Sequence, residues 1–130
     1  MNEVYPRFSQ KELASPDTGD HHMDPEFMAI VLNIREEYNK PMIVTSGYRS
    51  PEHNASVSST GRTGPHTTGR AIDVLVCGAD ALDLIDHAML NGITGIGIKQ
   101  HGPHKDRFIH LDDLPDAPRQ PRPWIWSYGA

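Results

Sequence analysis

Apolar residues recur at helical spacing in one segment near the amino terminus. Asp24-Pro25-Glu26 is a typical helix start, because proline suits the first turn and acidic side chains interact favourably with the positive end of the helix dipole. The apolar positions that follow lie three or four residues apart: Phe27, Ile30, Val31, Ile34 and Tyr38. We expect this stripe to face the core and the helix to end before Pro41.

Short apolar runs predict four strands, at residues 42–45, 71–76, 93–98 and 107–111. We expect the last two to pair antiparallel through the loop His101-Gly102-Pro103-His104. A second helix is predicted over residues 80–90, closed by Asn91-Gly92 and with Leu82, Ile85 and Met89 on one face. Helices mixed with antiparallel strands indicate the α+β class.

Two polar segments separate these elements. Residues 50–65 are rich in Ser, Thr, Gly and Asn and predict a flexible loop, which either closes over a peptide or is an ordinary surface loop. Residues 115–123 hold four prolines and predict an extended segment that brings Trp124 and Trp126 back to the core or to the rim of a cleft. Aromatic residues at alternate positions of a short strand favour packing over substrate contact.

The composition predicts one small domain over residues 1–130, which we expect to be a monomer. The only cysteine is Cys77, which excludes an internal disulfide. Twelve basic and seventeen acidic residues give a net charge of -5, with no run of lysine or arginine, so nucleic acid is not expected as a partner. No apolar run is long enough for membrane insertion, and residues 1–7 show no pattern of a secretory signal.

Two histidines and one aspartate form a candidate metal site. His66 precedes Asp73 by seven residues, and His110 lies in the apolar run Phe108-Ile109-His110-Leu111. Two imidazoles and one carboxylate suit a divalent metal of intermediate softness, zinc above all, and leave a fourth position for water. This set of donors is typical of hydrolytic sites.

The spacing of His66 and Asp73 is too long for two ligands on one helical turn. Thr67-Thr68-Gly69 predicts a turn in which Gly69 takes a positive φ, so His66 is expected on a loop that folds back over the strand carrying Asp73. A carboxylate in a buried strand is costly unless it is paired or binds metal. His110 is expected on a neighbouring strand that faces it.

Each of these residues also has a purely structural interpretation. A histidine near a strand is often a core residue with satisfied hydrogen bonds, and a buried aspartate often caps a turn or pairs with an arginine. For Asp73 the candidate arginines are Arg70 and Arg49. The combination of three donors with the glycine turn favours the metal site over these separate explanations.

Several motifs together resemble a known family. These are Ser46-Gly47-Tyr48-Arg49-Ser50-Pro51 with Asn54, the segments 66–73 and 108–112, and Trp124-Ile125-Trp126. The pattern resembles the zinc D-Ala-D-Ala carboxypeptidase-like peptidases (peptidase M15-like), which are grouped with lysostaphin-type peptidases and the hedgehog amino-terminal domain. The resemblance runs from about Phe8 to Tyr128, and it implies a small antiparallel sheet flanked by helices.

The resemblance also implies roles for single residues. His66, Asp73 and His110 match the zinc ligands of the family, and Arg49 matches an arginine that approaches the substrate near the scissile bond. A guanidinium can hold a terminal carboxylate or stabilise an oxyanion. The alternative for Arg49 is a structural arginine paired with a surface acid.

One position departs from the family pattern. Many members carry Glu or Asp three residues before the last histidine ligand as the general base, but this chain has Arg107 there. Asp112 shares a strand face with His110 and is expected either to orient that histidine or to act as the base. The preceding loop offers three further candidates that could reach the water, namely His101, His104 and Asp106.

These observations predict a zinc peptidase that cleaves peptidoglycan stem peptides or cross-links, of the phage endolysin or murein endopeptidase type. One alternative is a D,D-carboxypeptidase or dipeptidase. The other is a zinc-containing structural or binding module without catalysis, a possibility that the missing acid at Arg107 keeps open. We expect synthesis in the cytoplasm and action at the cell wall, as a phage lysin or a virion component.

Overall fold

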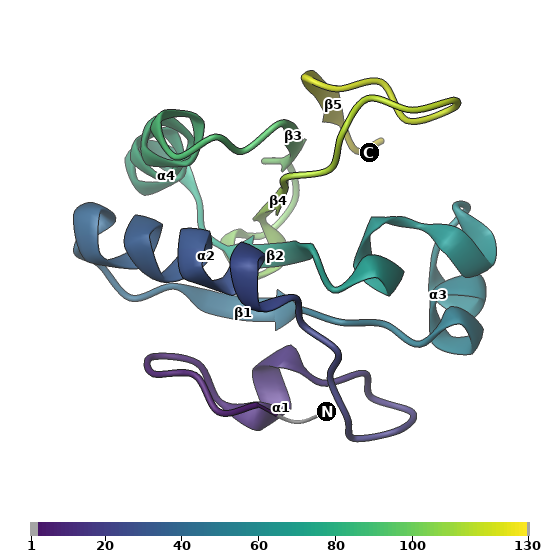
Figure 1. Ribbon diagram of the computed structural model, residues 1–130. Helices are drawn as coiled ribbons and strands as arrows, with labels where there is room; N and C mark the ends of the chain where they lie inside the picture. The colour runs from purple at the N-terminus through teal and green to yellow at the C-terminus, as the bar shows by residue number, and fades with distance from the viewer. Residues whose placement is uncertain (1–2, 130) are drawn as a thin grey trace.

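A five-stranded sheet organises the protein. The computed structural model describes residues 3–129 of the 130-residue chain (Figure 1). The strand order is β1-β2-β4-β3-β5, and every neighbouring pair is antiparallel except β3 and β5, which are parallel. The bounds of the strands are β1 Ile43–Ser46, β2 Ala71–Leu75, β3 Gly95–Lys99, β4 Phe108–Asp112 and β5 Trp124–Ser127.

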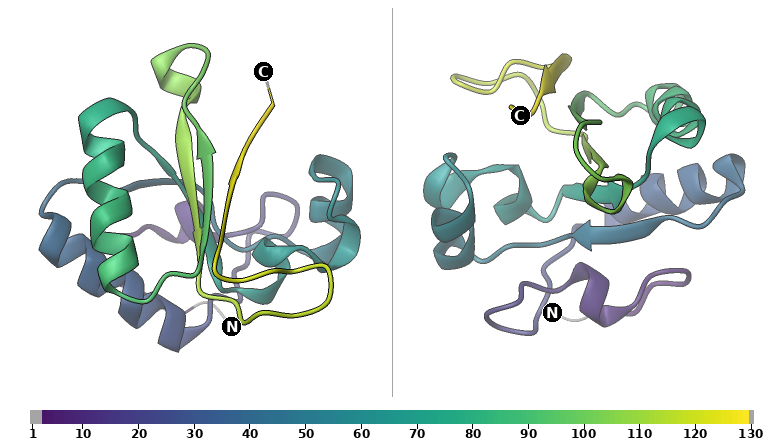
Figure 2. Two further views of the ribbon diagram at one scale, coloured as in Figure 1. Left: turned by 90° about the horizontal axis from the view of Figure 1, so that it is seen from above. Right: turned by 180° about the vertical axis from the view of Figure 1, so that it is seen from behind.

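Helices lie on both sides of this sheet. Figure 2 shows two longer helices together on one side and a shorter one on the other. In chain order the helices are α1 Gln10–Leu13, α2 Pro25–Tyr38, α3 Pro51–Val57 and α4 Gly78–Leu90, with short 3-10 turns η1 Gly61–Thr63, η2 Pro65–Thr68 and η3 His104–Asp106. The predicted α+β class is confirmed. None of the helices in the described part of the chain has the length and apolar character needed to cross a bilayer.

The first long helix follows its sequence signals closely. The carboxylate of Asp24 accepts hydrogen bonds from the backbone N–H groups of Glu26 and Phe27, and Pro25 occupies the first turn. Asn39 ends α2 in the left-handed conformation, with φ of 55°. Four of the five predicted stripe residues are buried in the core, and Ile30 is partly buried against it.

The predicted face of α4 was wrong. Leu82 and Met89 are 72% and 64% exposed, whereas the buried residues of this helix are Ala81, Leu84 and Ala88. Small residues let α4 approach the sheet and α2 closely, so the larger apolar side chains one position away point outward. Size at the contact, and not hydrophobicity alone, decides which face of this helix is buried.

The segment 50–65 was predicted as a loop but contains a helix. The Ser50 hydroxyl accepts a hydrogen bond from the backbone N–H of His53, Pro51 starts α3, and Glu52 lies in the first turn. Helix α1 was not predicted at all. Its signal is a capping box, in which Ser9 and Glu12 exchange hydrogen bonds between side chain and backbone.

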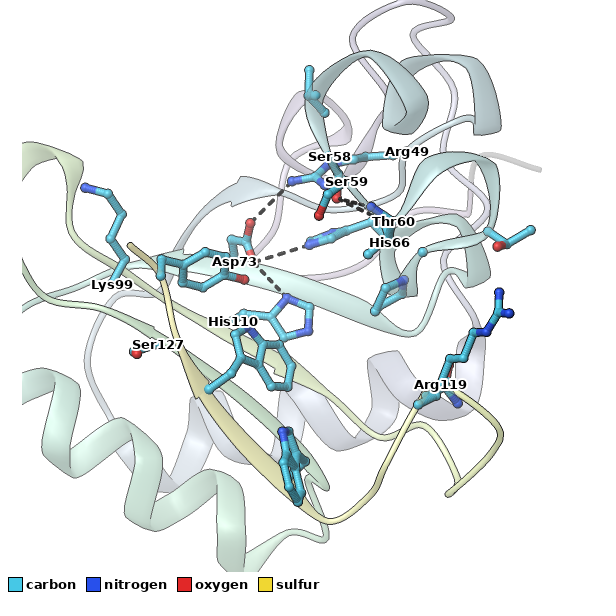
Figure 3. A pocket seen from close by; sticks show the side chains of 18 of the residues that line it. Arg49, Ser58, Ser59, Thr60, His66, Asp73, Lys99, His110, Arg119 and Ser127 are labelled. Carbon is cyan, nitrogen blue, oxygen red and sulfur yellow. Dashed lines mark hydrogen bonds and ion pairs between the residues drawn. The ribbon is translucent and has the colours of Figure 1, made fainter. Parts of the chain in front are cut away.

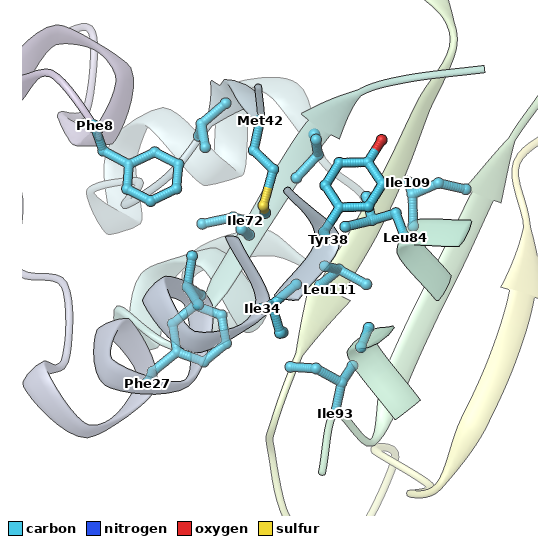
Figure 4. Close-up of a cluster of buried hydrophobic side chains, with 14 of the residues drawn as sticks. Phe8, Phe27, Ile34, Tyr38, Met42, Ile72, Leu84, Ile93, Ile109 and Leu111 are labelled. Atoms are coloured by element: carbon cyan, nitrogen blue, oxygen red, sulfur yellow. The ribbon is translucent and has the colours of Figure 1, made fainter. Parts of the chain in front are cut away.

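The sheet has two chemically different faces, because side chains alternate along each strand. One face packs its branched residues against α2 and α4 to form the core shown in Figure 4. The opposite face carries small and polar residues on its three central strands: Asp73, Gly95, Gly97, His110 and Asp112. The alternation therefore places the candidate ligands away from the core on the side of α3.

A glycine turn connects η2 to β2. Gly69 has φ of +76°, as predicted, and a Cβ atom built there would lie 1.9 Å from the backbone oxygen of His22. The carbonyl of Gly69 accepts a hydrogen bond from the backbone N–H of Asp24, at 2.9 Å. The turn that follows His66 is thus fastened to the start of α2.

We expect Gly69→Ala to lower the free energy of unfolding by about 3 kcal/mol or more, because left-handed strain and steric overlap add at this position. Gly92→Ala is the matched control, since Gly92 has φ of +85° but no other atom lies within 4 Å of the place its Cβ would take. Strain alone should cost the control about 1 kcal/mol. Equilibrium urea unfolding with chelator present measures both values. Equal losses in the two variants would contradict the close approach at Gly69.

Candidate metal centre

Three predicted ligands meet on the polar face of the sheet. Asp73 on β2 and His110 on β4 are direct cross-strand partners, and His66 on η2 reaches them from the adjoining turn. Figure 3 shows both histidine side chains pointing toward the carboxylate of Asp73. All three residues are buried, and one ligand atom from each lies within 4.8 Å of the others.

The geometry identifies the atoms that face one another. Asp73 Oδ1 is 3.0 Å from His110 Nδ1 and 3.3 Å from His66 Nε2. The two imidazole rings are 5.1 Å apart between centroids and nearly perpendicular, at 74°. One carboxylate and one nitrogen of each ring therefore surround a common point.

The other nitrogen of each ring has its own partner. His66 Nδ1 lies 2.7 Å from the backbone oxygen of Gly47, which can only accept, so this nitrogen carries the proton. His110 Nε2 lies 2.7 Å from Asp112 Oδ2 and donates in the same way. These contacts leave His66 Nε2 and His110 Nδ1 as the lone pairs that can coordinate a metal.

The electrostatics of the group favour positive charge at its centre. Burial raises the pKa of Asp73, but the facing histidines His66 and His110 lower it more, and the net shift is downward. Burial lowers the pKa of His110, whereas its hydrogen bonds to Asp112 and Asp73 raise it, with a net rise. Two imidazole lone pairs and a carboxylate form a donor set that fits zinc, and a cation between them would compensate the buried charge of the carboxylate.

Arg49 is held beside this group. Its Nε donates to Ser46 Oγ at 3.0 Å and its Nη1 to Asn54 Oδ1 at 3.1 Å, while Nη2 lies 3.6 Å from Asp73 Oδ2. Asn54 is 1% exposed and comes from α3, the helix that sequence reasoning missed. The guanidinium is thus fixed by two neutral side chains and one acid, which is the pairing of Asp73 with Arg49 that the sequence left open.

The second candidate arginine for Asp73 has other partners. Arg70 makes a two-pronged contact with Asp113, with Nε 2.8 Å from Oδ1, and its Nη1 lies 2.7 Å from Asp24 Oδ1. This arginine joins the start of α2 to the end of β4. It therefore serves the scaffold and not the metal centre.

Asp112 lies behind His110. It is fully buried, and its carboxylate contacts the ring nitrogen of His110 that points away from Asp73. Burial raises its pKa, but the hydrogen bonds from His110 and Arg122 lower it further, to about 2. The ring of His110 thus stands between Asp112 and the point where the three ligands converge, a position suited to orienting the histidine.

The loop candidates for a base lie elsewhere. His101, His104 and Asp106 are not among the residues that line the cavity at the metal centre. The backbone oxygens of His101 and Asp106 accept hydrogen bonds from Lys99 Nζ, and Asp106 Oδ1 pairs with Lys105. Arg107, at the position where relatives carry an acid, donates to the backbone oxygen of Gly102.

The metal centre lies in the wall of an open cavity of about 1170 Å³. Asp73 is the only carboxylate among the described residues that line it, against four cationic side chains: Arg49, Lys99, Arg119 and Arg122. The phenol of Tyr128 also lines the cavity, and burial together with the charge of Asp73 raises its pKa to about 12. The phenol therefore remains a hydrogen-bond donor at neutral pH.

Both tryptophans of β5 reach this cavity, at the rim that the sequence offered as one alternative. The Trp126 ring lies 5.0 Å from the ring of His110, and Trp124 is 55% exposed. The expectation that both serve packing holds only for Trp126. Sequence reasoning missed Arg122 and Tyr128, because neither belongs to a recognisable motif or to a periodic apolar pattern.

A family model described as Peptidase M15 matches residues 6–112, which is most of the chain and includes all three candidate ligands. No curated protein and no solved structure matches the sequence. The matched region ends at the last residue of β4, so β5 and the segment that leads to it lie outside it.

We expect the purified chain to bind one divalent metal ion, zinc in the first instance, and His66→Ala or His110→Ala to lose it under mild chelation. His104→Ala is the matched control, because this histidine is exposed and outside the cavity. Elemental analysis after dialysis measures the stoichiometry. Because metal binding adds to stability, chelator should also lower the melting temperature of wild type more than that of either ligand variant. Full metal content in both ligand variants would contradict the site.

Proposed function

The chain belongs to the peptidase M15 family, and on that premise we propose that it is a zinc-dependent hydrolase of peptide bonds in peptidoglycan stem peptides or cross-links. Membership in this family makes it a peptidase and suggests a metallopeptidase that acts on peptidoglycan. The zinc, the bond cleaved and the role of a phage-type lysin at the cell wall are the further content of the proposal.

One observation carries the proposal. His66 Nε2, His110 Nδ1 and the Asp73 carboxylate converge in the wall of an open cavity, with both other ring nitrogens engaged by acceptors. When bound there, zinc supplies Lewis acidity at a scissile carbonyl and generates a nucleophile at neutral pH. Three protein ligands that leave a position open toward a cavity suit catalysis better than a closed structural site does.

Arg49 and Tyr128 supply the polar groups beside the ligands. Arg49 Nη2 faces Asp73, and its other nitrogens are held by Ser46 and Asn54, so the planar fork is oriented before substrate arrives. In that place it can stabilise the negative oxygen that develops at an attacked carbonyl, or hold a substrate carboxylate. Tyr128 adds a neutral donor on the same cavity wall.

The charge of the cavity supports an anionic peptide as substrate. The whole chain has a net charge of -5, yet the described cavity lining has four cationic side chains and one carboxylate. A cationic hollow in an acidic protein attracts anionic ligands specifically to that hollow. Stem peptides carry free carboxylates along their length and at their ends, so they fit this charge better than a neutral peptide does.

Digestion of purified bacterial sacculi, followed by mass analysis of the fragments, tests the proposal directly. We expect the zinc-loaded protein to release fragments cut within stem peptides or cross-links, and His110→Ala to release none. Release of a terminal D-alanine alone would instead identify a D,D-carboxypeptidase, in which Arg49 holds the terminal carboxylate. Sacculi left unchanged by the zinc-loaded chain would overturn the proposal in favour of a structural or binding module.

We expect Arg49→Lys to lower kcat/KM on sacculus-derived peptides by about 10 to 100-fold while zinc content stays at one per chain. Lysine keeps the charge but loses the planar fork that contacts Ser46 and Asn54. Arg62→Lys is the matched control, since Arg62 is exposed and pairs only with exposed Glu52 in the contacts described. An Arg49→Lys enzyme with wild-type kcat/KM would show that Arg49 is structural.

A further inference from the structure

The segment after β4 closes over the metal centre. It lies outside the region that the family model matches, 6–112, yet it places Arg122, Trp126 and Tyr128 in the same cavity as the ligands. Figure 2 shows this last part of the chain on the side of the sheet opposite α2 and α4. Strand β5 joins the sheet beside β3 through parallel pairing, which fixes the segment in place.

Arg122 makes the closest contacts of this segment with the metal centre. Its Nε donates to Asp112 Oδ1 at 2.9 Å and its Nη2 to Asp112 Oδ2 at 2.8 Å, so both carboxylate oxygens are engaged. The Arg122 side chain is 7% exposed and that of Asp112 is fully buried. A two-pronged pair of this kind restricts both the position and the rotation of the carboxylate.

The same carboxylate holds the ligand. Asp112 Oδ2 accepts the hydrogen bond from His110 Nε2 at 2.7 Å, and His110 Nδ1 on the other side of the ring faces Asp73 at 3.0 Å. A continuous chain of charged and hydrogen-bonded groups thus runs from Arg122 through Asp112 to the coordinating nitrogen. Without Arg122, Asp112 would be a buried carboxylate that keeps only its contacts with His110 and the backbone of Leu114.

Two glycines of β3 leave the space that this arrangement needs. A Cβ atom at Gly95 would lie 2.3 Å from Asp112 Oδ1 and 2.6 Å from Arg122 Nε. A Cβ atom at Gly97 would lie 2.5 Å from Trp126 Nε1, and the Trp126 ring packs against both His110 and the Arg122 guanidinium. Every larger residue at these positions would displace the pair or the indole. The bare strand therefore serves the contact between the carboxy-terminal segment and the metal centre.

We propose that Arg122 is a positioning residue of the metal centre, which acts through Asp112 to hold the ring of His110 in its coordinating orientation. This inference rests on the proposed metal site but not on which bond is cleaved. Arg122 does not need to touch the substrate for this role. It keeps the Asp112 carboxylate aligned, and Asp112 in turn holds the Nε2–H of the ring and directs the lone pair of Nδ1 toward the metal.

The test measures metal binding and not only hydrolysis. Zinc affinity of the full chain is determined by competition with a chromophoric chelator, and the ligand geometry by the visible absorption of the Co²⁺-loaded protein. We expect Arg122→Gln to weaken zinc binding by about 10 to 100-fold and to change the Co²⁺ spectrum. Arg122→Lys keeps the charge but not both donors, so its loss should be intermediate. Arg119→Gln is the matched control, because Arg119 is an exposed arginine of the same segment and cavity.

A double-mutant cycle with Asp112→Asn separates positioning from general support of the fold. If Arg122 acts through Asp112, the loss from Arg122→Gln should nearly vanish in the Asp112→Asn background. Gly95→Ala, which leaves both charged residues in place but crowds them, should reproduce the changed Co²⁺ spectrum. Wild-type zinc affinity and spectrum in Arg122→Gln, or additive losses in the cycle, would overturn the proposal.

The outcomes also distinguish this inference from the proposed function. A chain that binds zinc but does not digest sacculi leaves the positioning role of Arg122 fully measurable, since affinity and spectrum need no substrate. Conversely, an active enzyme in which Arg122→Gln has wild-type metal binding refutes the positioning role while the function stands. Equilibrium unfolding of the metal-free variants in urea shows any loss of stability separately, and a loss there with unchanged zinc affinity counts against the proposal.

Discussion

A buried carboxylate between two imidazole rings is the interaction on which the rest of this structure depends. Asp73 lies on a central strand with only 6% of its surface exposed, where an uncompensated charge would be strongly unfavourable. Compensation comes from three directions, through His66, His110 and Arg49. Each of these residues comes from a different part of the chain, so their meeting requires the sheet register, the turn at η2 and the segment after β1 to be correct together.

The surrounding structure holds each ligand by a second contact. The backbone oxygen of Gly47 fixes the ring of His66, and the backbone N–H of Arg49 donates to the backbone oxygen of His66 at 3.1 Å. Asp112 fixes the ring of His110 from the opposite side. These contacts settle which nitrogen of each ring faces Asp73. The donor set is therefore oriented by the protein alone, which lowers the cost of organising it when a metal binds.

The alternation of side chains along the strands lets one small sheet carry both a core and a reactive centre. Branched residues on one face pack against α2 and α4, while glycine, histidine and aspartate occupy the other. The glycines of β3 are as necessary as the charged residues, because they leave room for Arg122 and Trp126 beside the ligands. The core thus fixes the register, and the register fixes the distance between Asp73 and His110.

The sequence by itself determined the α+β class, the bounds of α2, the glycine turn at Gly69 and the family, because each depends on local periodicity, capping or a contiguous motif. It also singled out His66, Asp73 and His110, whose residue types suit a metal wherever they lie. Only the tertiary structure decided that Asp112 stands behind His110, that the loop after β3 lies outside the cavity, and that Arg122 reaches Asp112. These facts depend on cross-strand register and on where β5 joins the sheet, and such long-range pairings leave no mark in the spacing of residues along the chain.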